Sequence, residues 1–87
     1  MPKPRTESGE KNLIGSRLKA LRRRDHLSQR DLAHQLQLVG MDMDKNVITR
    51  IETNKRYVTD IELRAIAKLF HVTYEYLIDG IEKDPSD

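Results

Sequence analysis

The 87-residue sequence contains no cysteine and no long apolar run. The absence of cysteine excludes a disulfide framework and any thiolate metal site. No apolar stretch approaches the roughly 18 residues that a membrane-spanning helix needs. No signal peptide precedes the domain, so we expect a cytoplasmic protein with no membrane segment. Hydrophobic residues make up 37% of the chain, which suits one small domain that a partner or a second copy would help to stabilise.

Patterns that indicate catalysis or metal binding are also missing. The three histidines, His26, His34 and His71, have no metal-ligand spacing, and no Cys or Glu lies at a ligand-like offset from them. There is no glycine-rich phosphate loop, and no Ser-His-Asp or paired-carboxylate arrangement is supported. We therefore predict that the protein is not an enzyme and needs no metal or cofactor.

Charge is distributed unevenly along the chain, although the net charge is only +2. Residues 1–27 contain eight Lys or Arg against three Asp or Glu, whereas residues 59–87 contain three against seven. A basic end suits a polyanionic partner, and an acidic end is expected to face away from it. The alternative is a solvated surface without a partner.

Helical periodicity dominates the middle of the chain, and no convincing period-two pattern indicates a strand. Apolar spacing predicts helices over about 12–25 and 44–54, with further helices beginning at Ser28, Thr59 and Thr73. Ser28 can accept a first-turn N–H, and Thr59 with Glu62 makes a capping box. The third helix could begin at either of two aspartates, Asp42 or Asp44.

Five short helices with tight connections predict a compact all-α bundle. Residues 1–11 are expected to form a flexible arm, 12–81 the domain and 82–87 a polar tail. Asn54 and Gly80 favour the left-handed conformation that often ends helices. The second helix, joined to the third by a turn, has the layout of a helix-turn-helix.

Three stretches resemble the Cro/repressor-type (XRE) helix-turn-helix family: "LSQRDLAHQL", "ITRIETNKR" and "ELRAIAKLFHVTYEYLI". The resemblance covers roughly residues 12–79. It implies a five-helix bundle of the phage-repressor DNA-binding-domain type, which binds double-stranded DNA, usually as a homodimer. One stretch departs from the family pattern, because "QLVGMDMDKNV" is about five residues longer than the usual turn. We therefore expect an extended turn between helices two and three.

The helix predicted over about 44–54 has the two faces that a groove-reading helix needs. Val47, Ile48 and Ile51 fall on one stripe and can hold the helix to the domain. The opposite face carries short polar or basic side chains that can meet base edges in the major groove. The candidates for base contact are Lys45, Asn46, Thr49 and Arg50. The alternative is a solvated helix face.

The resemblance also implies residues that hold the phosphate backbone. Gln29 matches the family position whose side chain and backbone N–H meet a phosphate, and a helix N-terminus suits an anion. Lys55 and Arg56, just past the third helix, and Arg17 in the first helix are further candidates for phosphate contact.

Glu52 is an acid on the predicted reading helix. In the family the matching glutamate pairs with an arginine of the first helix, and Arg22 is the corresponding position here. A bidentate pair would tie the first helix to the third and keep the carboxylate away from phosphate. We therefore expect Arg22 and Glu52 to form a structural ion pair.

The last predicted helix and its exit carry more apolar area than a thin monomer can cover. We expect a homodimer through this region, matching the paired half-sites of a palindromic operator. The alternative is a monomer in which the same residues close the core. The residues concerned are Tyr74, Tyr76, Leu77, Ile78 and Ile81.

These features predict a sequence-specific DNA-binding transcriptional regulator, expected to be a repressor. Within DNA binding, the alternative is an antitoxin or a restriction-modification control protein of the same fold. A second alternative is a protein-interaction module that kept the fold without DNA binding.

Overall fold

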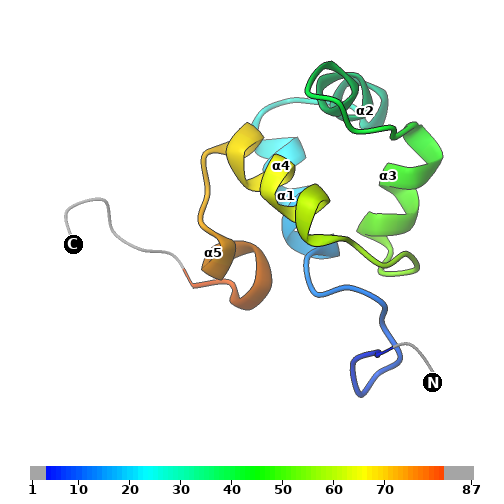
Figure 1. Cartoon of the computed structure of the whole chain (residues 1–87). Coiled ribbons are helices and arrows are strands. Elements are labelled where there is room, and N and C mark those ends of the chain that lie inside the picture. The colour runs from blue at the N-terminus through cyan, green and yellow to red at the C-terminus, as the bar shows by residue number, and fades with distance from the viewer. Residues whose placement is uncertain (1–3, 82–87) are drawn as a thin grey trace.

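The computed structural model describes residues 4–81, which form five α-helices and no strand. They are α1 (Gly15–Arg24), α2 (Gln29–Leu38), α3 (Lys45–Glu52), α4 (Asp60–Phe70) and α5 (Tyr74–Asp79). In Figure 1, α2 and α3 adjoin at one side of the bundle, and α5 lies toward the other side. The predicted all-α fold is confirmed. The predicted tail, 82–87, and the first three residues of the arm lie outside the described residues, so those domain limits stay predictions.

The helices begin at the polar caps that the sequence indicates. Ser28 and Thr59 each close a reciprocal capping box at the starts of α2 and α4, and Thr73 accepts the first-turn N–H of α5. The Asp44 carboxylate accepts the backbone N–H of Val47 at 2.9 Å. The third helix therefore begins after Asp44, because that side chain satisfies one of the N–H groups that a helix start leaves unpaired.

The first helix begins three residues later than predicted, at Gly15 rather than Asn12. The Asn12 side chain is buried and makes hydrogen bonds in two directions. Its Oδ1 accepts the backbone N–H of Ile14 and of Gly15, at 3.1 and 2.9 Å. Its Nδ2 donates to the carbonyls of Ile51 and Arg56, at 3.1 and 2.8 Å. Asn12 thus joins the start of α1 to the end of α3 instead of forming part of a helix.

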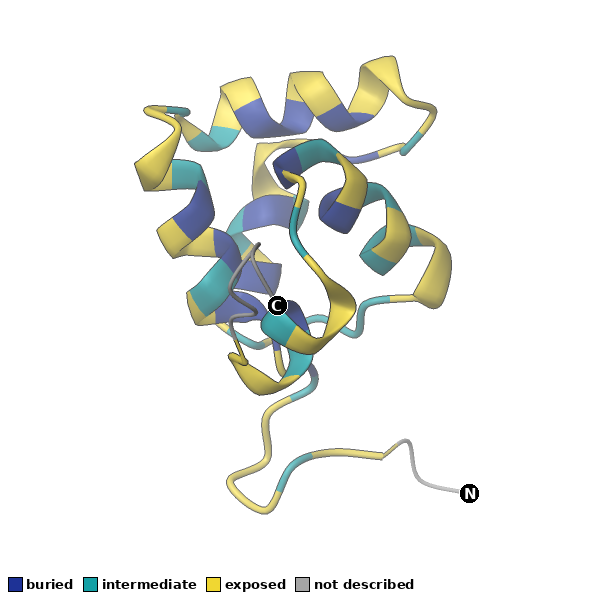
Figure 2. Cartoon of the chain, turned by 90° about the vertical axis from the view of Figure 1, so that its left-hand side faces the viewer, coloured by how far each residue is buried: buried dark blue, intermediate teal, exposed yellow. Residues whose placement is uncertain are grey.

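The core is built from the inward faces of all five helices together with one residue of the turn between α2 and α3. Figure 2 shows these buried faces in dark blue, turned toward the centre of the bundle. The largest fully buried side chains are Leu18, Leu32, Leu36, Met43, Ile48, Ile51, Ile66 and Leu77. The acidic α5 also supplies a core residue, so it is part of the domain.

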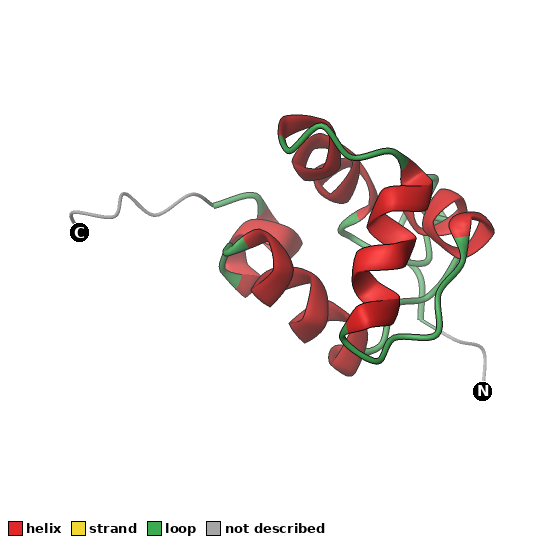
Figure 3. Ribbon diagram, turned by 90° about the horizontal axis from the view of Figure 1, so that it is seen from above, coloured by secondary structure: helices red, strands yellow, loops and turns green. Residues whose placement is uncertain are grey.

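The extended turn between α2 and α3 is anchored to the bundle. It spans residues 39–44 and forms an irregular loop that joins α2 to α3 (Figure 3). The Met43 side chain is only 1% exposed, and its carbonyl accepts from Gln37 Nε2 at 2.6 Å. The Met41 N–H donates to the Leu36 carbonyl at 2.9 Å. The longer turn therefore keeps α3 in a fixed place relative to α2.

Gly15 marks a close approach of α1 to α3. A β-carbon added there would lie 2.5 Å from the carbonyl oxygen of Ile51, far inside van der Waals contact. The Asn54 side chain, which donates to the carbonyl and to Oδ1 of Asn12 at 3.1 and 3.0 Å, would lie nearly as close. The two helices can therefore meet here only because residue 15 has no side chain.

Replacing Gly15 by alanine should destabilise the protein by about 1–3 kcal/mol, because the added methyl group must displace backbone of α3. This loss is expected although alanine favours a helix over glycine by about 1 kcal/mol. Urea unfolding followed by circular dichroism measures the difference. Ser16→Ala, at the exposed neighbouring position, is the control and should stay within about 0.5 kcal/mol of wild type. A Gly15→Ala protein as stable as wild type would contradict the close approach.

Candidate nucleic-acid interface

The faces of α3 are divided between the core and the outer surface. Ile48 and Ile51 are completely buried and hold the helix against the core. Lys45, Asn46 and Arg50 are exposed, and their side chains lie on the outer surface of the bundle. A helix held by one apolar stripe leaves the rest of its circumference open to a large partner.

Glu52, at the end of α3, is a buried acid with a complete set of partners. Its side chain is 3% exposed, and that of Arg22 is 11% exposed. Arg22 Nε donates to Oε2 at 2.7 Å, and Arg22 Nη2 donates to Oε1 at 3.0 Å. The hydrogen bond with Glu52 raises the pKa of the Arg22 guanidinium further above its usual range, against the opposing effect of burial. This bidentate ion pair ties α1 to α3.

Gln29 and Thr49 extend the same network to α2, which sequence reasoning did not foresee. Gln29 Nε2 donates to Glu52 Oε1 at 3.1 Å. The Thr49 hydroxyl has two acceptors within reach, Gln29 Oε1 at 2.9 Å and the carbonyl of Lys45 at 3.0 Å. The side-chain amide of Gln29 is therefore directed at α3. The only sequence signal for this contact is that Gln29 begins a helix beside the predicted reading helix.

The remaining phosphate candidates have different surroundings. Lys55 is exposed just past α3. Arg56 is half-buried, and its Nη1 and Nη2 donate to the two carboxylate oxygens of Glu62, both at 3.0 Å. Arg17 Nη1 lies within hydrogen-bond distance of the carbonyls of Leu77 and Ile78, at 3.0 and 2.9 Å. The structure thus groups Arg17 with α5 and not with the residues around α3.

The exposed charge of α3 is entirely positive. Of its three charged residues, Lys45 and Arg50 are exposed, whereas Glu52 is buried against Arg22. The Asp44 carboxylate, just before the helix, accepts the backbone N–H of Val47. An anionic partner that approaches α3 therefore meets two cations and short polar side chains, with the exposed Asp44 carboxylate at the start of the helix.

Within residues 4–81, no group of three or more histidine, cysteine or acidic side chains is placed to hold a metal ion. None of the helices in that range has the length and apolar character needed to cross a bilayer.

Removing one partner of the Arg22–Glu52 pair should cost about 3–5 kcal/mol of stability, because the other charge stays buried alone. Arg22→Met and Glu52→Met are the single variants, and the double variant should lose much less than their sum. Chemical denaturation of all four proteins gives the coupling energy. The exposed Arg24–Asp25 pair, whose side chains are 53% and 40% exposed, is the matched control and should show almost no coupling. Additive losses at residues 22 and 52 would contradict the pairing.

The comparison with protein families agrees with this geometry. The helix-turn-helix family model HTH_3 matches residues 18–77, which is more than half of the chain. No curated protein and no solved structure matches this chain. The matched span includes all of α2, the extended turn and α3, as well as both partners of the Arg22–Glu52 pair. The chain therefore belongs to the Cro/repressor-type (XRE) helix-turn-helix family of DNA-binding domains.

Proposed function

We propose that this protein is a sequence-specific transcriptional repressor that reads the major groove of its operator with α3. The observation that carries the proposal is the surface of α3, which exposes Lys45, Asn46 and Arg50 while Ile48 and Ile51 fix the helix from behind. A major groove admits one α-helix, and the N-terminal half of such a helix makes the base contacts. The protein then acts in the cytoplasm by occupying the operator.

The side chains of α3 supply complementary base chemistry. Lys45 or Arg50 can donate to guanine O6 and N7, and Asn46 can pair with adenine. The Thr49 hydroxyl already donates inside the protein, to Gln29 or to the Lys45 carbonyl. We therefore assign to Thr49 an apolar contact through its methyl group, which suits the thymine methyl.

Phosphate contacts are assigned to both ends of the helix-turn-helix. Gln29 is the first residue of α2, where backbone N–H groups are unpaired and the helix dipole favours an anion. Because its side-chain amide is engaged by Glu52 and Thr49, we assign the phosphate contact to its backbone N–H. Lys55 and Arg56 act from the other end, just past α3, and Arg17 is left out because it lies against α5.

A homodimer that binds a palindromic operator is part of this proposal. Tyr74 is 49% exposed and Ile81 is 51% exposed, so apolar surface remains around α5. In Figure 1, α5 and α3 lie toward different sides of the bundle, which leaves α3 free when two copies pair through α5. Two-fold pairing of the protein is then matched by two-fold symmetry of the DNA site.

Selection of binding sites from random duplex DNA should yield a palindrome, which tests specificity and dimerisation together. Arg50→Ala should then weaken binding to the selected site by about 1–3 kcal/mol and relax the preference at one base position in each half-site. Lys68→Ala is the control, because it removes one positive charge at an exposed position of α4. It should leave both the affinity for DNA and the base preference unchanged. Wild-type affinity and preference in Arg50→Ala would remove Arg50 from the reading surface.

Replacing Lys55 or Arg56 by alanine should have different effects, although both residues are proposed to contact phosphate. Each substitution should weaken binding to specific and to nonspecific DNA alike, and should lower the slope of log K against log salt by about 1. Only Arg56→Ala should also destabilise the fold, by about 1.5–3 kcal/mol, because it breaks two hydrogen bonds to the Glu62 carboxylate. Filter binding and urea unfolding measure the two effects, and an unchanged salt slope in both variants would refute the phosphate role.

The same variant predicts a change in acid sensitivity. Burial raises the pKa of Glu62, but hydrogen bonds from Arg56 and from the backbone N–H of Thr59 outweigh it, so the pKa lies below its ordinary value. Glu62 therefore stabilises the fold above its unfolded pKa of about 4.5, and this contribution is lost as the pH falls through the folded value. The free energy of unfolding of Arg56→Ala should fall less steeply on acidification than that of the wild type. Lys55→Ala should show the same dependence on pH as the wild type.

A further inference from the structure

A line of exposed apolar side chains crosses the outer surface of α4. Val39 is 56% exposed, Ile61 is 58% exposed and Tyr74 is 49% exposed. Two hollows of about 350 and 290 Å³ lie along this line and share Ile61 and Arg64 as lining residues. The first hollow has an apolar floor that includes Met41, Ala65 and Leu69. We call the surface from Val39 to Ile61 the α4 groove; Tyr74, at the far end of the second hollow, belongs to the α5 surface of the proposed homodimer.

Two cations line the α4 groove without an ion-pair partner among residues 4–81. Arg64 and Lys68 are exposed and stand four residues apart on α4, and both line the first hollow. Within residues 4–81, neither side chain makes an ion pair, in contrast to Arg22, Arg24 and Arg56. Residues at this spacing lie on one face of a helix. The groove therefore combines an apolar floor with a positive edge, and its one acid, Asp60, lies in the second hollow.

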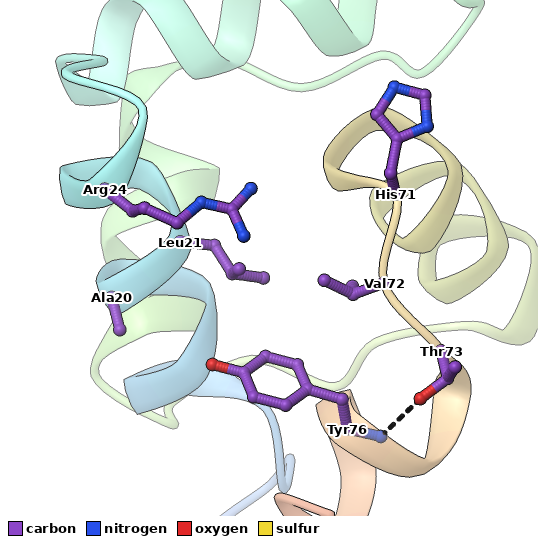
Figure 4. A pocket seen from close by; sticks show the side chains of 7 residues that line it. All are labelled: Ala20, Leu21, Arg24, His71, Val72, Thr73 and Tyr76. Atoms are coloured by element: carbon purple, nitrogen blue, oxygen red, sulfur yellow. Dashed lines mark hydrogen bonds between the residues drawn. The ribbon is translucent and has the colours of Figure 1, made fainter. Parts of the chain in front are cut away.

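A larger hollow, of about 470 Å³, lies between α1 and α5 but offers a weaker site. Figure 4 shows the Arg24 side chain reaching from α1 toward the segment that carries His71 and Val72. That guanidinium already donates to both carboxylate oxygens of Asp25, at 2.8 and 3.3 Å. An incoming anion would have to compete with this pair, whereas Arg64 and Lys68 carry no such partner.

We propose that the α4 groove binds an amphipathic helix of a partner protein, with apolar residues on one face and acidic residues beside them. The apolar face fills the floor, in the manner of a helix in a groove. The acidic flank pairs with Arg64 and Lys68, which gives the contact its orientation and its specificity. This function is additional to DNA binding, because no residue of α3 lines the groove.

Charge complementarity also selects this occupant over a second copy of the chain. A two-fold contact uses the same patch on both copies. A two-fold axis that passes through Arg64 and Lys68 would bring these cations of one copy toward the same cations of the other. A partner helix with acidic flanks meets no such repulsion.

The test uses the full chain, labelled with ¹⁵N, and two synthetic amphipathic helical peptides. Both carry leucines at helical spacing, but one has glutamates beside them and the other has lysines. The glutamate peptide should shift the amide signals of Val39, Met41, Ile61, Ala65 and Leu69 without shifting those of α3. The lysine peptide should bind at least about tenfold more weakly. Equal binding of both peptides, or no shift at the groove, would overturn the proposal.

Charge reversal provides the matched comparison. The double variant Arg64→Glu with Lys68→Glu should bind the glutamate peptide at least about tenfold more weakly than wild type does. It should also prefer the lysine peptide over the glutamate peptide. Lys19→Glu with Arg23→Glu, at exposed positions four residues apart on α1, changes charge equally and should leave the preference as in wild type. Equal effects of the two reversals would show a general charge effect and would refute a site at Arg64 and Lys68.

A final variant separates the groove from self-association and from DNA binding. Ile61→Asp, at an exposed position, should abolish peptide binding and leave the oligomeric state in sedimentation unchanged. Loss of a dimer in this variant would overturn the proposal, because a second copy would then occupy the groove. DNA binding is measured on the same proteins, and its failure in wild type would refute the proposed repressor while leaving the peptide result intact.

Discussion

The buried carboxylate of Glu52 is the group on which the arrangement of α1, α2 and α3 depends. It accepts two hydrogen bonds from Arg22 and one from Gln29, so both of its oxygens are satisfied. A charge that is 3% exposed is tolerated in a protein only when it is paired and hydrogen-bonded in this way. Since Gln29 also meets Thr49, one carboxylate sets the position of three helices and of a side chain on the outer part of α3.

This pairing decides what α3 presents to a partner. With the Glu52 charge compensated inside the domain, the exposed charges of the helix are Lys45 and Arg50. The anchored turn completes the arrangement, because the buried Met43 holds the chain and Asp44 then begins α3 at a fixed point. A groove-reading helix must be placed by rigid surroundings, since a base contact depends on the position of each donor.

The sequence predicted those features that depend on neighbouring residues and failed on those that depend on distant ones. Ser28, Asp44 and Thr59 cap their helices through bonds that span three residues, so local patterns identify Ser28 and Thr59 and limit the start of the third helix to Asp42 or Asp44. Asn12 bonds a carbonyl 39 positions away, and Gln29 bonds a carboxylate 23 positions away. No local pattern shows that these polar side chains turn inward. The Arg22–Glu52 pair was predicted because a family resemblance supplied the distant partner.

The six residues of the extended turn connect the two surfaces that are proposed to bind partners. Val39 and Met41 line the α4 groove, Met43 is buried in the core, and Asp44 caps α3. An occupant of the groove would therefore touch the same short segment that leads into α3, the proposed reading helix. Because Met43 is packed and its carbonyl is held by Gln37, a contact at Val39 or Met41 is expected to leave the start of α3 in place. The anchored turn thus separates the two surfaces, so one molecule can bind a partner at α4 and present α3 to DNA at the same time.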